Sequence, residues 1–425
     1  MTDRALPVDL RVRPVPLTRW QLVWLAAAVF VASAGYGALM PLLPKWLAPM
    51  MPGSSPAEIA RHVGMLSGAY AAGVLFGAPL WGFASDRFGR KLILTIGMLG
   101  YVTSVLLLLA SDLYQVRGIY AMRAATGFFV AAIVPIVPAL VAAHTPAAQR
   151  ARRFAWLSGM SLIGFLFGPG LIALAEGISH WLGEALPGSP TLTQIVIVLS
   201  ALLGAITMIG LAATLPGSTA VETQAPVKKV GAYAATVAPL WLLNGMVMFV
   251  LSGFELGIVL LGQQHAALSS RDIALMFAEC SLVMLFVNGL LFATALLEKA
   301  AARSLACTGL LLAVAGLLVL GQHSSSLGIY MGIGLTAAGT GLVLPLASFL
   351  AAGVRRQVLG TAMGGQAAAA GLGQTAGSAA GGWLFGAVGQ RSFYWLVVPL
   401  GLMLGLLAAR PGWGRSQMHR RRLTP

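Results

Sequence analysis

The sequence predicts an all-α polytopic membrane protein with twelve transmembrane helices in two pseudo-symmetric six-helix bundles. Of its 425 residues, 58% are hydrophobic and 9% are charged, whereas a soluble domain carries about 25% charged residues. Two further observations support this class: a series of twelve apolar segments, and the side of those segments on which lysine and arginine accumulate. Together they exclude a soluble globular protein.

Each apolar segment is long enough to cross the roughly 30 Å hydrocarbon core of a bilayer. The glycine-rich fifth and eleventh segments are the weakest, and the 52 glycines of the chain suit helices that pack closely inside a membrane. The segments lie at 20–43, 63–83, 92–111, 116–142, 154–176, 193–214, 236–261, 273–296, 304–321, 327–352, 360–387 and 393–409.

Lysine and arginine set the expected orientation, because cytoplasmic loops carry an excess of these residues. With the N-terminus in the cytoplasm, 21 of the 27 lie on the cytoplasmic side, five lie on the other side, and Arg123 lies inside a segment. We therefore expect a multi-pass protein of a cell membrane, of the bacterial inner-membrane type, with both termini cytoplasmic. The net charge of +15 belongs to these loops rather than to a basic face beside stacking aromatics, which argues against nucleic-acid binding.

A hydrophilic stretch near the middle divides the chain into two groups of six segments. The halves echo one another at offsets of about 205–212 residues, as expected for the tandem six-helix units of a transporter, which place the substrate site near the bilayer midplane between them. The expected parts are a cytoplasmic tail (1–19), a first bundle (20–214), a cytoplasmic linker (215–235), a second bundle (236–409) and a basic cytoplasmic tail (410–425).

A charged hairpin joins the second and third segments and reads Gly-Phe-Ala-Ser-Asp-Arg-Phe-Gly-Arg-Lys. Glycine permits close helix contact and a tight turn, and the acid can pair with a neighbouring base or with the positive end of a helix. A plain anchor on the cytoplasmic side would explain the three bases but neither the acid nor the glycines. The residues that carry this motif are Gly82, Asp86, Arg87, Gly89, Arg90 and Lys91.

This G-x-x-x-D-R-x-G-R-K pattern resembles the loop 2–3 signature of the major facilitator superfamily. The resemblance covers about 20–409 and implies the twelve-helix fold of that family and transport by alternating access. In the family the aspartate is held to latch the two halves on the cytoplasmic side, so the resemblance gives that role to Asp86. The second half has only a degenerate counterpart at Glu298 to Arg303.

Arg123 lies about seven residues into the fourth segment. A cation at the centre of a bilayer costs about 2.5–3.5 kcal/mol on insertion scales, so such a residue is by default a candidate for function. Arg123-Ala-Ala-Thr-Gly127 also resembles the span 4 motif of the family, whose arginine is associated with proton coupling. The alternative is that its side chain extends to the outer interface.

Glu255 and Glu279 lie at similar depth in the outer halves of the seventh and eighth segments. A low-dielectric environment favours the neutral form of a carboxylic acid, which suits a group that takes up and releases protons. We expect them to carry a proton or to bind a cationic substrate. The two acids could also repel each other or share a proton, or one of them could pair with Arg123. The alternative is that they face interfacial water.

The fifth segment contains Gly159, Gly164, Gly168 and Pro169. This arrangement resembles the span 5 signature of antiporters in the family, although the terminal glycine pair is replaced by Ile172 and Ala173. Small residues here are expected to pack tightly where the two halves meet. Four polar residues within later segments can either bind substrate or join helices, and these are Asn244, Asn288, Gln366 and Gln374.

No metal-ligand spacing, disulfide framework or cofactor motif is present, and both cysteines, Cys280 and Cys307, lie in apolar segments. The chain also lacks a Walker sequence, a G-x-S-x-G elbow and an H-E-x-x-H motif. We therefore expect no cofactor, no metal and no enzymatic activity. Transport would then draw on an ion gradient.

Within the superfamily the chain looks most similar to the twelve-span drug:proton antiporters, including tetracycline and multidrug exporters. The similar stretches are Gly37–Pro44, His62–Lys91 and Arg150–Trp156. Tetracycline exporters carry acidic residues in spans 1 and 3, where this chain has Ala32 and Ser104, and this departure argues against a metal–tetracycline substrate.

The sequence therefore predicts a monomeric, proton-coupled exporter of a small amphipathic or cationic compound. Its partners would be that compound, protons and the lipid bilayer. Two alternatives remain open: uptake of a small metabolite by proton symport, and export of an endogenous metallophore or siderophore. A carrier-like protein with a regulatory or assembly role is a third class.

Overall fold

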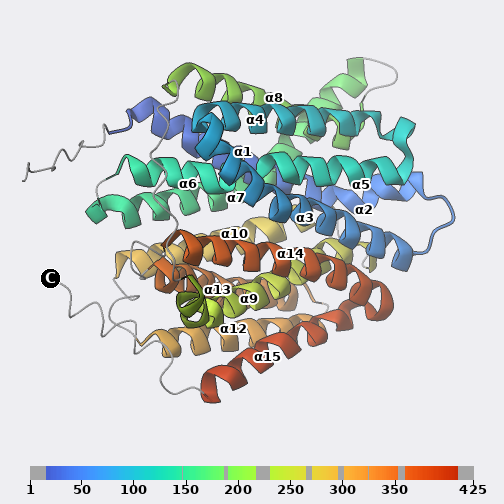
Figure 1. Cartoon of the computed structure of the whole chain (residues 1–425). Coiled ribbons are helices and arrows are strands. Elements are labelled where there is room, and N and C mark those ends of the chain that lie inside the picture. Colours follow the sequence, from blue (N-terminus) through green and yellow to red (C-terminus); the bar gives the residue numbers. More distant parts are fainter. Residues whose placement is uncertain are drawn as a thin grey trace, which may run out of the picture.

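The structure is a computed structural model of the chain. It describes residues 16–145, 147–185, 190–216, 230–264, 270–294, 301–323, 325–352 and 359–409. Within these residues every regular element is a helix, and Figure 1 shows the helices running side by side in two groups. The blue-to-green helices of the first half form one group, and the yellow-to-red helices of the second half form the other.

The first half contains one long or broken helix for each of its six predicted segments. Its elements are α1 (Arg19–Leu39), η1 (Met40–Leu42), α2 (Leu43–Leu47), η2 (Ala48–Met50), α3 (Pro56–Phe88), α4 (Arg90–Leu107), η3 (Leu108–Ala110), α5 (Ser111–Val130), α6 (Ile133–Ala143), α7 (Ala147–Ala185) and α8 (Leu192–Thr214). The second half consists of α9 (Val230–Gln264), α10 (Ser270–Ala293), α12 (Ala302–Gln322), α13 (Ser326–Ala352), α14 (Leu359–Val388), η5 (Gly389–Arg391) and α15 (Ser392–Ala409).

Among the described residues, 11 stretches are long and apolar enough to cross a membrane. The last one, Gly364–Ala409, is 46 residues long, about twice what one crossing needs. It holds both α14 and α15, separated by η5, where Gly389 has φ = 60°. The structure therefore contains the twelve crossings that the sequence predicts. An even number also places the start of α1 and the end of α15 at the same end of the molecule (Figure 1).

Local sequence explains where several of these helices begin and break. Thr18, Ser55 and Thr191 each cap a helix through a capping box with the residue three positions later, which satisfies the free N–H groups of the first turn. The fourth span is broken between α5 and α6, just before Pro135. Proline lacks an N–H and its ring clashes with the carbonyl four residues earlier, which favours a break in the helix there.

The helix α9 begins before the predicted second bundle. The sequence assigns 215–235 to the linker, and α9 begins at Val230, whereas its membrane-length apolar part begins at Val237. The sequence from Val230 onward contains three alanines within seven residues, and alanine has the highest helix propensity, so the helix extends into the predicted linker. The basic part of the linker and the C-terminal tail from 410 lie outside the described residues.

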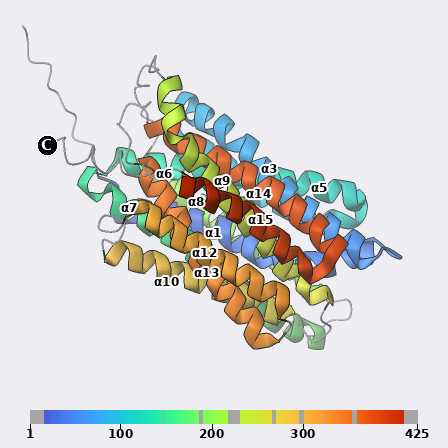
Figure 2. The same cartoon turned by 90° about the horizontal axis from the view of Figure 1, so that it is seen from below.

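The two halves meet where α14 lies beside α3, as Figures 1 and 2 both show. Glycines make this approach possible: a Cβ added at Gly64 would lie 2.7 Å from the Cα of Gly382, and one added at Gly386 would lie 2.7 Å from the carbonyl oxygen of Ala57. The series continues along α3 as far as Leu75, which faces Gly371. These contacts start at the end of the molecule that carries the Gly53 turn, and we call it the Gly53 end.

The charged hairpin lies at the opposite end, which we call the Gly89 end. Gly89 has φ = 93° between α3 and α4, a conformation that residues with a Cβ rarely adopt. Asp86 lies further along α3 than Leu75, the last of these glycine contacts with α14. These glycine contacts between the halves are therefore distant from the hairpin.

Candidate functional site

Arg123 of α5 is the largest charged group in the interior of the described structure. Its side chain is 1% exposed, and its guanidinium carbon lies 4.9 Å from the centre of the Tyr70 ring of α3. This arrangement is a cation–π contact. Two of its nitrogens, Nε and Nη2, are buried with no hydrogen-bond partner among the described residues. The side chain therefore points into the bundle, and extension to the outer interface is ruled out in this structure.

Two glycines hold Arg123 against Tyr70. A Cβ at Gly127, one turn after Arg123, would overlap the carbonyl group of Tyr70. A Cβ at Gly73 would in turn overlap the backbone of α5 at Ala124. Because neither residue has a side chain, α3 and α5 cross almost backbone to backbone. The close contact between α3 and α5 thus explains why the R-x-x-x-G motif has glycine at position 127.

Three tyrosines surround the guanidinium. Tyr36 of α1, Tyr70 and Tyr101 of α4 all interact electrostatically with Arg123, and the rings of Tyr36 and Tyr70 are 5.1 Å apart. Tyr36 also interacts with the side chain of Gln374 of α14. This interaction crosses from the first half to the second, so the tyrosine cluster reaches the interface between them.

Glu255 of α9 lies on the second-half side of this cluster. Its side chain is half-buried and interacts electrostatically with Tyr36. Tyr36 is thus shared by Glu255 and Arg123. Among the described residues these two charges form no direct ion pair, in contrast to one of the sequence-based expectations. The carboxylate and the guanidinium instead lie on opposite halves, with the Tyr36 ring near both.

Glu279 of α10 is the second carboxylate near the interface. Its Oε2 is buried without a hydrogen-bond partner in the described part of the chain, and its Oε1 lies 3.4 Å from where a Cβ at Gly334 of α13 would be. Both Glu279 and Glu255 interact electrostatically with Cys280. The two acids, predicted to share a depth on consecutive helices, therefore both interact with one cysteine.

Aromatic rings complete the apolar part of the site. Phe165 of α7 lies 5.9 Å from Tyr36 and 5.6 Å from Phe277 of α10, measured between ring centres. The series Tyr70, Tyr36, Phe165, Phe277 therefore runs from one half of the molecule to the other. An apolar or amphipathic molecule between the halves would meet these ring faces and edges.

The four polar candidates of later spans have separate environments. Asn244 is buried and its Nδ2 donates to the carbonyl oxygen of Gln366 at 2.9 Å, so it joins α9 to α14. The side-chain amide of Gln366 is buried without a partner among the described residues. Gln374 interacts with Tyr36, and Asn288 is half-buried on α10. Of the four, Gln374 belongs to the tyrosine cluster.

In the charged hairpin, Asp86 and Arg87 are exposed. Asp86 interacts electrostatically with Arg90, whose Nη1 donates to the carbonyl oxygen of Ala139 at 3.4 Å. The Nζ of Lys91 donates to the carbonyl oxygen of Leu215 at 2.7 Å, which holds the hairpin to the end of α8.

Two expectations about glycine are wrong in this structure. A Cβ at Gly82 would make only an ordinary contact, 3.9 Å from Pro135, so close helix packing does not require glycine there. Gly164 and Gly168 of α7 pack against Phe30 and Gly37 of α1. Both helices belong to the first half, so these glycines tighten that half internally and do not lie at the interface between halves.

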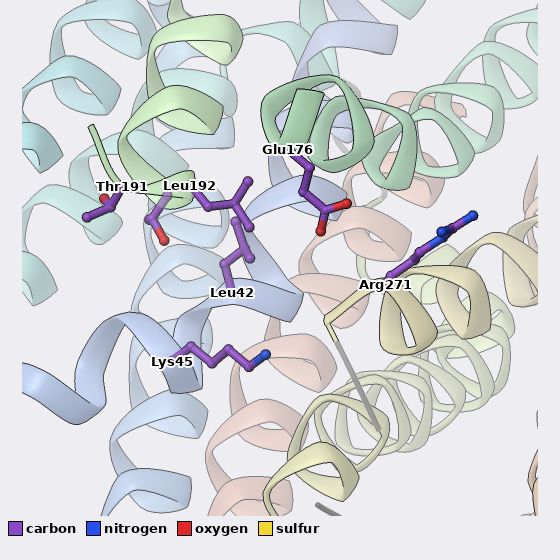
Figure 3. Close-up of a pocket in the computed structure, with 7 residues that line it drawn as sticks. Leu42, Lys45, Glu176, Thr191, Leu192 and Arg271 are labelled. Carbon is purple, nitrogen blue, oxygen red and sulfur yellow. The ribbon is translucent and has the colours of Figure 1, made fainter. Parts of the chain in front are cut away.

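A separate pocket of about 420 Å³ opens at the Gly53 end. Figure 3 shows Lys45 of α2, Glu176 of α7 and Arg271 of α10, which line it from three helices. All three side chains are exposed, and none of the predicted site residues lines it. In the part of the chain that the structure describes, no group of three or more His, Cys, Asp or Glu residues is placed to hold a metal ion.

Sequence reasoning did not assign a role to Tyr70 or Tyr101. A signal was available, because the chain has only eight tyrosines and these two lie within apolar segments. A buried tyrosine needs a partner for its hydroxyl, so tyrosine in a membrane span indicates a polar interior. Nothing in the sequence shows that both approach Arg123.

Comparison with known proteins agrees with this architecture. The profile of the Major Facilitator Superfamily matches residues 25–353. The class B tetracycline resistance protein of Escherichia coli is 35% identical over 162 residues, which are 37% of this chain and 36% of that protein. The quinolone resistance protein NorA of Staphylococcus aureus is 26% identical over 152 residues, or 36% and 37% of the two chains. Each match thus spans little more than a third of the relative's length.

Solved structures share the fold over almost the whole chain. The human organic anion transporter MFSD10 has a TM-score of 0.68 at 20% identity and covers 92% of this chain and 99% of its own. A bacterial homologue of the lysosomal transporter Spinster, inward-facing and unoccupied, has a TM-score of 0.70 at 15% identity, with 96% and 99% covered. The inward-open xylose transporter XylE of E. coli has a TM-score of 0.68 at 16% identity, with 94% and 98% covered.

The twelve helices in two halves, the hairpin motif and the profile match over most of the chain agree with one another. Both curated relatives are drug-resistance proteins, in line with the predicted drug-exporting branch. The chain is a multi-pass membrane transporter that belongs to the Major Facilitator Superfamily.

Proposed function

We propose that the protein is a proton-coupled exporter that exchanges protons for a small amphipathic or cationic compound. The observation that carries the proposal is the position of Glu255. Its half-buried carboxylate lies at the interface of the halves, close to Tyr36 and Cys280, and forms no ion pair with the nearby Arg123. An uncompensated carboxylate in this position favours either a proton or a bound cation.

Competition for one carboxylate is enough to couple the two fluxes. A cationic compound would bind the ionised form of Glu255 and lie along the aromatic rings, which attract cations through their faces. Protonation of Glu255 would remove this attraction and release the compound. Glu279 is the second candidate, since it also interacts with Cys280 and its Oε2 has no hydrogen-bond partner among the described residues.

Alternating access requires one state that is open to the outside and one that is open to the cytoplasm. The contacts between the two halves are compatible with the second of these states. The halves are packed at the Gly53 end. With the termini in the cytoplasm, as the distribution of lysine and arginine predicts, this packing would correspond to a state closed to the outside. Asp86, exposed here, would then latch the halves when the cavity opens outward.

The relatives support export but do not define the compound. Their names refer to tetracycline and quinolone resistance, and Ala32 and Ser104 stand where tetracycline exporters carry acids. Metallophore or siderophore export is a subclass of the proposal. Proton symport of a metabolite is the alternative, and similar structures include a D-xylose–proton symporter, which shares the fold at 16% identity.

Replacing the two acids tests the proposal. In everted vesicles with an acidic interior, wild-type protein should accumulate a fluorescent amphipathic cation such as ethidium. Glu255→Gln should reduce the initial rate of accumulation at least tenfold, and the double variant Glu255→Gln with Glu279→Gln should abolish accumulation. The reason is that an amide side chain neither ionises nor exchanges a proton with water in the way a carboxylic acid does.

Glu176→Gln is the matched control, because it removes an exposed carboxylate of α7 that lies away from the tyrosine cluster. It should transport at the wild-type rate. Undiminished accumulation by the double variant would rule out a proton-coupling role for both acids.

A further inference from the structure

Four hydrogen-bonding atoms in the interior of the first half have no partner among the described residues. They are Nε and Nη2 of Arg123, the hydroxyl of Tyr101 and the hydroxyl of Ser200. These side chains come from α5, α4 and α8 and are 1%, 3% and 1% exposed. Most buried polar groups in proteins are hydrogen-bonded, so several unpartnered ones in one region indicate a missing ligand or ordered water.

The groups lie close to one another. Tyr101 interacts electrostatically with Arg123. The Tyr101 hydroxyl and the Cβ of Ser200 both face Gly35 of α1, where an added methyl group would overlap that hydroxyl and lie 3.9 Å from Ser200 Cβ. One turn after Ser200, Gly204 packs against the Tyr101 ring. Three helices therefore direct unpartnered polar groups into one region beside α1.

The polar groups of this region are rich in hydrogen-bond donors and carry a positive charge. A guanidinium has five N–H donors and no acceptor, while each hydroxyl can donate as well as accept. The groups with which Arg123 interacts electrostatically are the three tyrosines, and Glu255 interacts with Tyr36 instead. A positively charged region that offers donors is complementary to an anion, because charge-assisted hydrogen bonds are about twice as strong as neutral ones.

We propose that Arg123, Tyr101 and Ser200 form an anion-binding subsite in the first half, which accepts a free halide or the carboxylate of a transported compound. If the ligand is a free halide, the proposal is independent of the proposed export function. If the ligand is the carboxylate of a transported compound, the proposal rests on that function. The compound would then carry an anionic group toward Arg123 and a cationic group toward Glu255. Tyr36, which interacts with both residues, would lie along such a molecule.

Thermal unfolding of the purified full-length protein in detergent tests the subsite without any proton gradient. Sodium bromide and sodium benzoate would each replace sodium gluconate at constant ionic strength, since the bulky polyhydroxylated gluconate suits an aromatic-lined site poorly. We expect a saturable rise in Tm of about 2 °C or more when the anion is well above its Kd. A response to bromide assigns a free-anion site, and a response to benzoate alone assigns a substrate carboxylate.

Variants separate this site from general salt effects. Arg123→Gln should lose the shift, and Tyr101→Phe or Ser200→Ala should raise the half-saturating concentration about 2- to 10-fold, as expected for one lost hydrogen bond. The two hydroxyl variants keep the test valid if Arg123→Gln does not fold. Arg117→Gln removes an exposed charge from the same helix and should respond like the wild type.

Two results would overturn the subsite. One is the absence of any saturable anion-specific shift in the wild type, and the other is an equal shift in Arg123→Gln or in both hydroxyl variants. Water would then be the partner of these groups. If the transport test shows no proton coupling, the proposal of a halide site still stands. If the unfolding test shows no anion binding, the proposed exchange of protons at Glu255 still stands.

Discussion

Gly127→Ala is expected to abolish transport and to destabilise the first half of the molecule. The added methyl group would overlap the carbonyl group of Tyr70 and lie only 2.8 Å from its carbonyl carbon. Backbone atoms on both sides of the crossing cannot move independently of their helices, so α3 and α5 must separate. Overpacking of this kind costs about 1–3 kcal/mol, and it would also withdraw Arg123 from Tyr70.

Thermal unfolding followed by circular dichroism, together with vesicle transport, checks this prediction. The control is Gly159→Ala, because a Cβ at Gly159 of α7 would have nothing within 4 Å. Alanine has a higher helix propensity than glycine by about 1 kcal/mol, so the control should be as stable as the wild type or slightly more stable. Equal stability and transport in Gly127→Ala and Gly159→Ala would show that the α3–α5 crossing is not as tight as described.

Gly64→Val is expected to leave the protein folded but to stop transport. Its side chain would project into α14, where a Cβ would already be 2.7 Å from Gly382 Cα and 2.8 Å from the carbonyl oxygen of Ser378. Unlike the Gly127 contact, this one joins the two halves. In alternating access such contacts separate during each cycle, so the variant should rest in the state that is open at the Gly53 end.

Labelling of an introduced cysteine can detect that state. Ser378 is 1% exposed on α14, so Ser378→Cys should react slowly with a maleimide in an otherwise unchanged protein. In the presence of Gly64→Val it should react at least tenfold faster. Cys280 and Cys307 would first be replaced by alanine to remove background. Normal transport by Gly64→Val, with the introduced thiol still protected from the maleimide, would contradict the prediction.

Different parts of the structure were predictable to different degrees. The twelve crossings followed from composition and charge, and the turn at Gly89 followed from its place in a charged hairpin, where a positive φ favours glycine. The start of α9 at Val230 was missed because polar composition, rather than helix propensity, was used to delimit the linker. Such a boundary depends on local helix stability, which hydropathy does not measure.

The site was predictable only in part, because membrane helices lack the clear apolar and polar faces of soluble ones. The cost of burying a cation singled out Arg123, which is buried, but the direction of its side chain came only from the structure. The same ambiguity led to the wrong interface for Gly164 and Gly168. Tyr36, Tyr70 and Tyr101 come from three separate helices, and their proximity is a tertiary property.

The most direct test of proton exchange is to measure proton movement when the substrate is added. Everted vesicles containing the protein would be energised to an acidic interior, and the pH gradient would be followed with a quenched acridine dye. If the protein exchanges protons for substrate, adding a transported cation outside should collapse part of the gradient within seconds in the wild type and not in Glu255→Gln with Glu279→Gln. Transport of the same cation with an unchanged gradient in wild-type vesicles would contradict proton-coupled export.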